Sequence, residues 1–320
     1  MRLPPIGSLS VNATGWGFFL CTEKSMRMGR GGEYVAAILQ DATGEVVARV
    51  LDNVDRLKDE FEAGEFVKAQ GRLVAFNGRS QFQIDSIRRV MLASDSQDRR
   101  EGFREELLVA TAPRPIAEMW IELEQIVGSV GNPHLRPLLK TIVAANEERL
   151  KIWPAARTVH HAYRGGFLEH VLKVAEVGRS LAVMYDADAD LVVAGALLHD
   201  IGKLQELEYD ITTSYTRDGN LIGHITLGAL QVADAIHKMP EFPDALRSAL
   251  IHLIASHHGE RDHGSPVEPM TVEAYILAAA DNLDATLNQV RCAIRQHDGR
   301  DEFTSYQPRL GRSLWKGPAR

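Results

Sequence analysis

The sequence predicts a two-domain protein, a small β-barrel followed by an all-α domain. A chain of 320 residues is longer than one hydrophobic core usually organises. The first ninety residues alternate short strand-like runs with turns, whereas from Pro115 onward the apolar residues recur at helical spacing. We therefore expect a first domain over 1–92, a polar linker over 93–114 and a helical domain over 115–320.

The first domain contains five strand-like runs and one short helix. The helix begins after Asn53, and Asn77-Gly78 between the last two runs is a strong hairpin signal. The runs, rich in β-branched and apolar residues, are 17–28, 34–40, 45–51, 66–76 and 80–90. The order βββαββ is that of an OB-fold, a five-stranded barrel that commonly binds oligonucleotides on strands 2 and 3 and on loops 1–2 and 4–5.

Five residues of this barrel are candidates for contact with a nucleic acid. Arginines in loops 1–2 and 4–5 can meet phosphates, and neighbouring aromatic rings can stack on bases. The candidates are Arg27, Arg30, Tyr34, Phe76 and Arg79. Barrel aromatics also fill interiors, and residues 1–94 hold 12 Lys and Arg against 11 Asp and Glu, so the electrostatic attraction is weak. We expect the barrel to bind single-stranded nucleic acid, and we leave open which of the five residues contact it.

The second domain reads as a series of amphipathic helices. Pro115 suits the first position of a helix, and an apolar stripe follows it. Further helices are predicted over 135–151, 167–184, 189–199, 224–238, 243–256 and 271–296. The remainder of the chain after residue 94 holds 24 Lys and Arg against 32 Asp and Glu. That acidic balance fits carboxylates gathered around cations, solvated surface, or both.

Histidines and aspartates interrupt the apolar helix runs of this domain at five places. The interrupting residues are His170, His199, Asp200, His224, His257, His258 and Asp281. A buried ionisable group without a partner costs several kcal/mol. Divalent cations would compensate all of them at once, and the alternative is a set of hydrogen-bonded core histidines. Imidazole and carboxylate without thiolate suit Mn²⁺, Fe²⁺, Co²⁺, Ni²⁺ or Zn²⁺ better than Ca²⁺. Seven ligands exceed one tetrahedral site and fit two ions roughly 3.5–4 Å apart.

This order of residues resembles the HD-domain superfamily of metal-dependent phosphohydrolases. The match includes the run His199-Asp200-Ile201-Gly202-Lys203 and covers about 155–290. With an OB-fold ahead of it and His160-His161-Ala162-Tyr163-Arg164-Gly165-Gly166 leading into His170, nearly the whole chain resembles the YhaM-type 3′-to-5′ exoribonuclease family. The resemblance implies metal-dependent removal of nucleotides from a single-stranded 3′ end, with Mn²⁺ as the preferred ion and the barrel holding the strand.

The resemblance also implies roles for individual residues. One ion would be held by His170, His199, Asp200 and Asp281. Asp200 would bridge to a second ion held by His224, His257 and His258, and which of the last two is the stronger ligand stays open. Lys203 would contact the scissile phosphate, so that Asp200 and Lys203 are the expected catalytic residues; the alternative for Lys203 is a lysine at a helix C-terminus. His160, His161 and Arg164 would line the substrate approach; the alternative for the Arg164-Gly165-Gly166 portion is to stabilise a turn.

The expected function is a metal-dependent exonuclease that releases 5′-nucleoside monophosphates from single-stranded RNA, and also from single-stranded DNA. Two alternatives remain: a phosphohydrolase of small nucleotides or cyclic dinucleotides, and a nucleic-acid-binding factor with incidental hydrolysis. No apolar run approaches the ~20 residues of a membrane span, no secretory h-region is present, and Cys21 and Cys292 form no pattern. We expect a cytoplasmic protein with no membrane contact. Self-association is left open, and the basic tail 309–316 either reaches RNA or docks on the helical domain.

Overall fold

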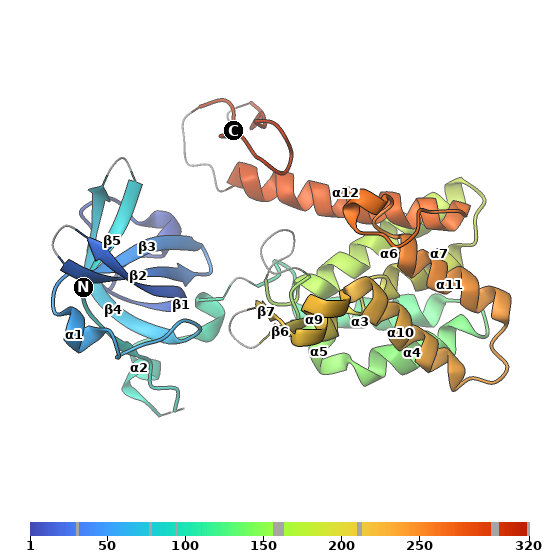
Figure 1. Ribbon diagram of the computed structural model, residues 1–320, viewed down its shortest axis with the longest axis horizontal. Helices are drawn as coiled ribbons and strands as arrows, with labels where there is room; N and C mark the ends of the chain where they lie inside the picture. Colours follow the sequence, from blue (N-terminus) through green and yellow to red (C-terminus); the bar gives the residue numbers. More distant parts are fainter. Residues whose placement is uncertain are drawn as a thin grey trace. The chain divides into compact units, whose positions relative to one another are not determined.

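The computed structural model consists of two compact units, a β-barrel and a helical domain (Figure 1). It describes residues 1–29, 32–76, 79–93, 95–109, 111–155, 163–209, 213–295 and 301–318. The first unit lies within Met1–Thr111, and the second comprises Ala112–Tyr209 and Thr213–Arg320. The predicted fold class, a barrel followed by a helical domain, is confirmed.

The first unit is a closed five-stranded barrel of the predicted order. Its strands are β1 (Thr14–Gly29), β2 (Gly32–Asp41), β3 (Gly44–Val50), β4 (Phe66–Phe76) and β5 (Arg79–Arg89). They pair in the order β1-β2-β3-β5-β4, with β3 and β5 parallel and the other pairs antiparallel. The short helix α1 (Val54–Leu57) connects β3 to β4; Asn53 precedes it in the left-handed conformation, without a side-chain capping bond. Alternate residues such as Val35, Leu39 and Phe82 fill the barrel because strand side chains alternate between the two faces.

The segment expected as a linker, 93–114, instead packs largely on the outside of the barrel. It contains the short helical turns α2 (Gln97–Arg100) and η2 (Glu105–Leu107). Phe103 is fully buried, with its ring 5.5 Å from Phe18 and 5.4 Å from Phe66. Asp98 is also fully buried and accepts two hydrogen bonds of 2.7 Å from Arg88. The polar composition predicted a linker, but one aromatic ring and one paired acid anchor the segment to the barrel.

The described part of the second unit is built mainly from helices, with a short two-stranded sheet and bridged residues near the end of the chain as exceptions. The helices are α3 (Ile116–Ser129), α4 (Leu135–Ala145), α5 (Glu147–Ile152), α6 (Gly166–Met184), α7 (Ala189–Leu198), α8 (Lys203–Glu206), α9 (Arg217–Ile222), α10 (His224–His237), α11 (Asp244–Ser256) and α12 (Val272–Arg295). The sheet is a hairpin of β6 (Leu207–Tyr209) and β7 (Thr213–Tyr215). Elements of six residues or fewer are too short to show a hydrophobic periodicity in the sequence.

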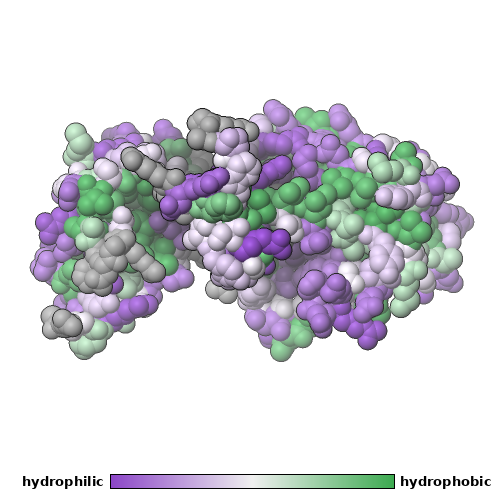
Figure 2. Space-filling view, turned by 90° about the horizontal axis from the view of Figure 1, so that it is seen from above, coloured by the Kyte–Doolittle hydropathy of each residue, from purple (hydrophilic) through white to green (hydrophobic). Residues whose placement is uncertain are grey.

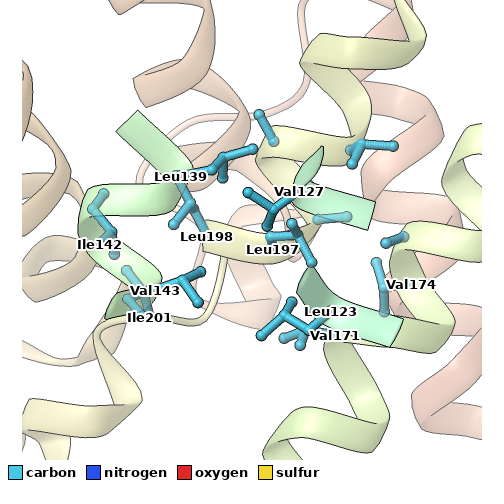
Figure 3. Close-up of a cluster of buried hydrophobic side chains, with 14 of the residues drawn as sticks. Leu123, Val127, Leu139, Ile142, Val143, Val171, Val174, Leu197, Leu198 and Ile201 are labelled. Carbon is cyan, nitrogen blue, oxygen red and sulfur yellow. The ribbon is translucent and has the colours of Figure 1, made fainter. Parts of the chain in front are cut away.

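Helix α7 forms the centre of the helical unit. Every residue from Leu191 to Leu198 is buried, as expected of a helix that is apolar on all sides. Figure 3 shows Leu197, Leu198 and Ile201 surrounded by apolar side chains of α3, α4 and α6. Because α7 ends inside this core, the polar residues that follow it are held in the interior.

Helix α12 forms one outer side of the same unit (Figure 1). Its inner face buries Ala274, Leu277 and Ala280, while Leu283 and Leu287 remain exposed. Figure 2 looks down on this side and shows a band of hydrophobic residues along the helical unit. Among the described residues, no helix combines the length and the apolar character that a bilayer crossing requires.

Candidate active site

Five histidines and two aspartates from five helices meet inside the helical unit. His170 lies in α6, and Asp281 lies in α12. The others stand at helix ends: His199 and Asp200 after α7, His224 at the start of α10, and His257 and His258 after α11. Their possible ligand atoms form three overlapping groups, each within 4.8 Å: His170, His199 and Asp281; His199, Asp200 and His257; and His224, His257 and His258. The structure thus brings together all seven residues that the sequence singled out.

Asp200 occupies the middle of this cluster. Its Oδ1 lies 3.5 Å from Nε2 of His224 and 3.5 Å from Nε2 of His257. Its Oδ2 lies 3.3 Å from Nε2 of His199 and 3.6 Å from Nε2 of His170. We call the group of His170, His199 and Asp281 and the group of His224, His257 and His258 the two end groups. The Asp200 carboxylate faces histidines of both end groups, which is the arrangement that a bridging ligand needs.

Each of the five imidazole rings has an outer partner at Nδ1. The Nδ1 atoms of His199, His257 and His258 bond to backbone oxygens of Ala196, Ile254 and His263 at 2.9, 2.7 and 2.8 Å. A carbonyl oxygen only accepts, so the ring proton of these histidines is on Nδ1 and the lone pair is on Nε2. Nδ1 of His224 and of His170 face carboxylates instead, Glu206 at 3.0 Å and Asp284 at 2.8 Å. This tautomer, held by an outer partner, is the one that metal-binding histidines adopt.

Three buried polar atoms at the centre have no hydrogen-bond partner among the described residues. They are Oδ1 of Asp200, Nε2 of His224 and Nε2 of His257. Buried polar atoms are almost always paired, because an unmade hydrogen bond costs about 1–3 kcal/mol. A cation between these atoms would satisfy all three, and a donor set of imidazole nitrogen and carboxylate oxygen suits borderline divalent ions. The residues present therefore fit a metal.

At most positions of the cluster, the pKa shifts favour the protonation state that binds a metal ion, which is an ionised carboxyl or a neutral imidazole. Burial opposes the charge on Asp200, but Lys203 and His199 outweigh it and hold the pKa of that carboxyl well below its usual range. Burial lowers the pKa of His257, and burial with the neighbouring His257 lowers the pKa of His258 to about 4. His170 is the exception: burial lowers its pKa, but Asp281 and Asp284 outweigh burial and raise it to about 9. An ion bound there must displace a proton.

Lys203 places an ammonium group at the edge of the cluster. The side chain is 9% exposed, and Nζ donates a 2.6 Å hydrogen bond to Oδ2 of Asp200. Burial lowers its pKa, but the charge of Asp200 outweighs burial and raises it, so the group stays charged. The preceding Gly202 allows this turn to pass close to α10, since a Cβ there would lie 2.0 Å from the backbone oxygen of His224.

Two carboxylates of the site were missed by the sequence interpretation. Asp284 follows Asp281 by three residues, so the two share one face of α12 and both contact His170, at Nδ1 and Nε2. Glu206 accepts from both the backbone N and Nδ1 of His224, at 3.1 and 3.0 Å. The spacing of the two aspartates was a readable signal. The contact of Glu206 was not, because α8 and α10 meet only in the folded chain.

The predicted approach residues are only partly described. His160 and His161 lie outside the described residues. Arg164 is exposed, and its backbone oxygen accepts from the backbone N of Ala112 at 2.9 Å. No contact between the Arg164 side chain and the cluster is recorded within the described part of the chain. Its role in substrate approach stays a prediction.

The outer face of the barrel presents a row of polar side chains across its strands. Arg49 of β3 lies with its guanidinium 5.1 Å from the ring centre of Tyr34 on β2. Strand register places Arg49 opposite Gln83 of β5 and Gln83 opposite Arg72 of β4, and Arg72 donates to Gln83 at 3.1 Å. Tyr34 is half-exposed and so does not fill the interior. Arg49 and Arg72 were missed because an outward position becomes visible only once the register is known.

The other predicted contacts of the barrel lie at the ends of its hairpins. Arg27 is exposed near the end of β1, opposite Tyr34 in the β1–β2 register. Phe76 and Arg79 end β4 and begin β5 as a facing pair, and their side chains lie outside the described residues. Arg30 lies outside them as well. The contact of these residues with a nucleic acid stays a prediction.

Comparisons with known proteins give relatives for most of the chain. A sequence model of the HD domain family matches residues 167–286. The 3′-5′ exoribonuclease YhaM of Bacillus pumilus is 33% identical over 275 residues, which cover 86% of this chain and 85% of the relative. The same enzyme of Bacillus subtilis is 32% identical over 267 residues, covering 83% and 82%.

Solved structures resemble the two units separately. The second OB-fold domain of replication protein A from Methanococcus maripaludis matches 30% of this chain and all of that domain, at 16% identity and a TM-score of 0.25. The HD domain of the phosphodiesterase PgpH from L. monocytogenes matches 42% of this chain and 70% of that chain, at 20% identity and a TM-score of 0.26. Both scores are low, and the family assignment comes from the sequence relatives.

Proposed function

Because the chain belongs to the YhaM family of 3′-5′ exoribonucleases, we propose that it shortens single-stranded RNA from the 3′ end and releases 5′-nucleoside monophosphates. Single-stranded DNA is the second proposed substrate. The observation that carries the proposal is the convergence of five imidazoles and Asp281 around the Asp200 carboxylate. Such a cluster is suited to phosphodiester hydrolysis.

Two divalent ions are part of the proposal, with Mn²⁺ the first choice and Co²⁺, Fe²⁺, Ni²⁺ or Zn²⁺ as alternatives. One ion would be held by His170, His199, Asp200 and Asp281, and the other by Asp200, His224, His257 and His258. Bound divalent ions activate water and neutralise phosphate charge in hydrolytic sites of this kind. The short distances from Asp200 to both sets of rings support its role as the shared ligand.

Lys203 and Asp200 are the proposed catalytic residues. The Lys203 ammonium is fixed by Asp200 and is charged at neutral pH, so it can bind the scissile phosphate and stabilise negative charge that develops there. The surrounding core is apolar on all sides of α7, which keeps the ligands in fixed rotamers. His160, His161 and Arg164 are proposed to guide the strand toward this pair.

The barrel is proposed to hold the single strand. Tyr34 offers a stacking surface, and Arg27, Arg49 and Arg72 offer cations on the same outer side of the barrel. Arg30, Phe76 and Arg79 belong to the same proposal by their place at the hairpin ends. Removing Arg49 and Arg72 together is expected to flatten the salt dependence of RNA affinity by about 1.4 in log–log slope, because each phosphate contact on a single strand contributes about 0.7.

The test is a time-resolved digestion of 3′-labelled and 5′-labelled RNA across several divalent ions. The wild type should give a ladder that shortens from the 3′ end together with mononucleotides. Asp200→Asn should abolish the ladder, whereas Asp234→Asn, at an exposed position of α10, should not. Absence of products from the wild type would refute the proposal. Hydrolysis of nucleotides or cyclic dinucleotides alone would identify a small-molecule enzyme, and tight RNA binding without turnover a binding factor.

Self-association and location complete the proposal. Leu283, Leu287 and Tyr275 are exposed on α12, and extended apolar surface of this kind marks protein–protein contacts. A mass above 35.4 kDa in light scattering that falls after Leu283→Glu would support a homo-oligomer through this helix. A cytoplasmic location is proposed because the substrate is RNA, and fractionation of cells that express the protein checks it.

A further inference from the structure

Residues 302–316, within the last described segment of the chain, form a hairpin, which we name the C-terminal hairpin. Phe303 pairs with Trp315, and Gln307 pairs with Arg312 nearer the tip. The backbone N of Thr304 donates to the oxygen of Leu314 at 2.8 Å. These bonds hold the arms together, so the basic tail seen in the sequence is part of an ordered element.

The hairpin exposes aromatic rings to an unusual degree. Phe303, Tyr306 and Trp315 are 50%, 62% and 52% exposed. Among the side chains that the structure describes, Phe303 and Trp315 are the only Phe and Trp in the exposed class. Tyr185, Tyr215 and Tyr275 are exposed as well, but they lie in separate parts of the chain, whereas the hairpin brings three exposed rings together. An exposed aromatic cluster of this kind marks a binding surface.

The charges of the hairpin indicate the class of that ligand. Arg309 and Arg312 are exposed at the tip, and Lys316 lies at the base. No acidic residue stands between Phe303 and Trp315, and Glu302 at the base accepts a 2.7 Å hydrogen bond from the Trp315 indole. Exposed rings interleaved with cations are the surface that single-stranded nucleic acids prefer, because bases stack on rings while phosphates meet cations.

The position of the hairpin connects it to the metal cluster. A cavity of about 1140 Å³ is lined on one side by Glu302, Lys316 and Gly317 of the hairpin region. Asp284 and Lys173 line the same cavity, and Asp284 bonds to His170 of the cluster. The volume is slightly above that of typical ligand pockets, which is about 300–1,000 Å³. The cavity therefore joins the hairpin region to Asp284, the outer partner of one histidine of the cluster.

We infer that the C-terminal hairpin is a second binding site for single-stranded RNA, which takes the nucleotides upstream of the 3′ end. Tyr306 and Trp315 stack on bases, and Arg309 and Arg312 contact phosphates. This inference deepens the proposed exonuclease function and rests on it for the identity of the strand.

The charge part is tested by RNA binding without turnover, in the full-length Asp200→Asn protein with a metal chelator. Fluorescence anisotropy with a labelled 12-nucleotide RNA gives the Kd. Arg309→Ala/Arg312→Ala should weaken binding about ten-fold and flatten the log–log salt slope by about 1.4. The matched control is Lys238→Ala/Arg247→Ala, which also removes two exposed cations. Lys238 follows the end of α10 that is far from His224, and Arg247 lies near the end of α11 that is far from His257. It should leave the Kd unchanged.

The stacking part is tested at Tyr306, whose ring is the most exposed of the three. Tyr306→Phe keeps the ring and should keep the wild-type Kd, whereas Tyr306→Leu keeps an apolar side chain without a π-face. Because stacking of a base on a ring contributes substantially to affinity, Tyr306→Leu should bind about ten-fold more weakly. Equal loss in both variants would contradict stacking.

The two proposals fail in different ways. If the arginine pair and Tyr306→Leu bind RNA as tightly as the wild type, the inference is overturned even when the digestion ladder is present. It is also overturned if these variants bind RNA normally but lose self-association, since the hairpin is then a protein contact. A wild type that binds RNA through the hairpin without shortening it supports the hairpin and contradicts the exonuclease.

Discussion

Asp284 bonds to Nδ1 of His170 at 2.8 Å, while Asp281 lies 3.2 Å from Nε2 on the opposite side of the same ring. The two acids are one helical turn apart on α12, so residues of a single helix face contact both nitrogens of the imidazole. His224 has a comparable outer partner in Glu206. The two end groups of the cluster thus each contain one histidine oriented by a carboxylate, whereas His199, His257 and His258 are oriented by backbone oxygens.

Asp284→Ala is expected to weaken divalent-ion binding about 10–100-fold, because an outer partner fixes the tautomer and rotation of the ligand ring. Asp284→Asn retains an acceptor oxygen and should lie between Ala and wild type. Isothermal titration with Mn²⁺ measures the affinity, and Asn282→Ala, exposed on the same turn, is the control. Unchanged affinity in Asp284→Ala would show that the pairing does not orient the ring.

Glu206→Ala should act on the other end group, where Glu206 holds both the backbone and the ring of His224. If two ions bind in separable steps, Glu206→Ala should lower about ten-fold the affinity of the step that Asp284→Ala leaves unchanged. The double variant should lower the affinity of both steps. Glu206→Gln keeps the acceptor and should lose less. The same step affected by both variants would contradict two distinct ion positions.

The sequence predicted features that local patterning controls. The alternation of apolar and polar residues, together with the turn residues, was sufficient to predict the order of elements in the barrel. Apolar runs that end in His199-Asp200 or His257-His258 were sufficient to identify the seven residues of the cluster. Contacts between distant segments were not readable. The burial of Asp98 depends on Arg88, and the role of Glu206 depends on where α10 begins, neither of which a single-segment pattern contains.

Gly202→Ala is expected to disturb His224 although it touches no proposed ligand atom. An added Cβ would lie 2.0 Å from the backbone oxygen of His224 and 2.5 Å from the backbone N of Gly228, neither of which can turn aside. We expect a loss of about 2 kcal/mol in the free energy of unfolding, together with weaker ion binding. Thermal unfolding and Mn²⁺ titration measure the two effects.

The control is Gly128→Ala in α3, where a Cβ meets nothing within 4 Å. Alanine at an exposed helical position should raise stability by about 0.5–1 kcal/mol. If Gly202→Ala behaves like Gly128→Ala, the close approach of the α8 turn to α10 is not the reason for the glycine.

Asp98→Asn should release the segment that contains α2 and η2 from the barrel. The Arg88 guanidinium holds the pKa of the buried Asp98 carboxyl below its ordinary 3.8. The ion pair therefore stabilises the fold fully at pH values above about 4, and its contribution is lost as the pH falls through the lowered pKa. At pH 7, Asn should cost about 2 kcal/mol, since a charged hydrogen-bonded pair is replaced and Arg88 loses its partner.

Hydrogen exchange of the β4 and β5 amides reports this loss within the whole chain, and the exposed Asp59→Asn is the control. The difference between wild type and Asp98→Asn should shrink as the pH is lowered from 5 toward 3, because Asp98 of the unfolded wild type then takes up a proton more readily than the paired carboxyl of the folded protein. A difference that stays constant over that range would mean that shape rather than charge holds the segment. In that case Phe103, packed between Phe18 and Phe66, would be its principal anchor.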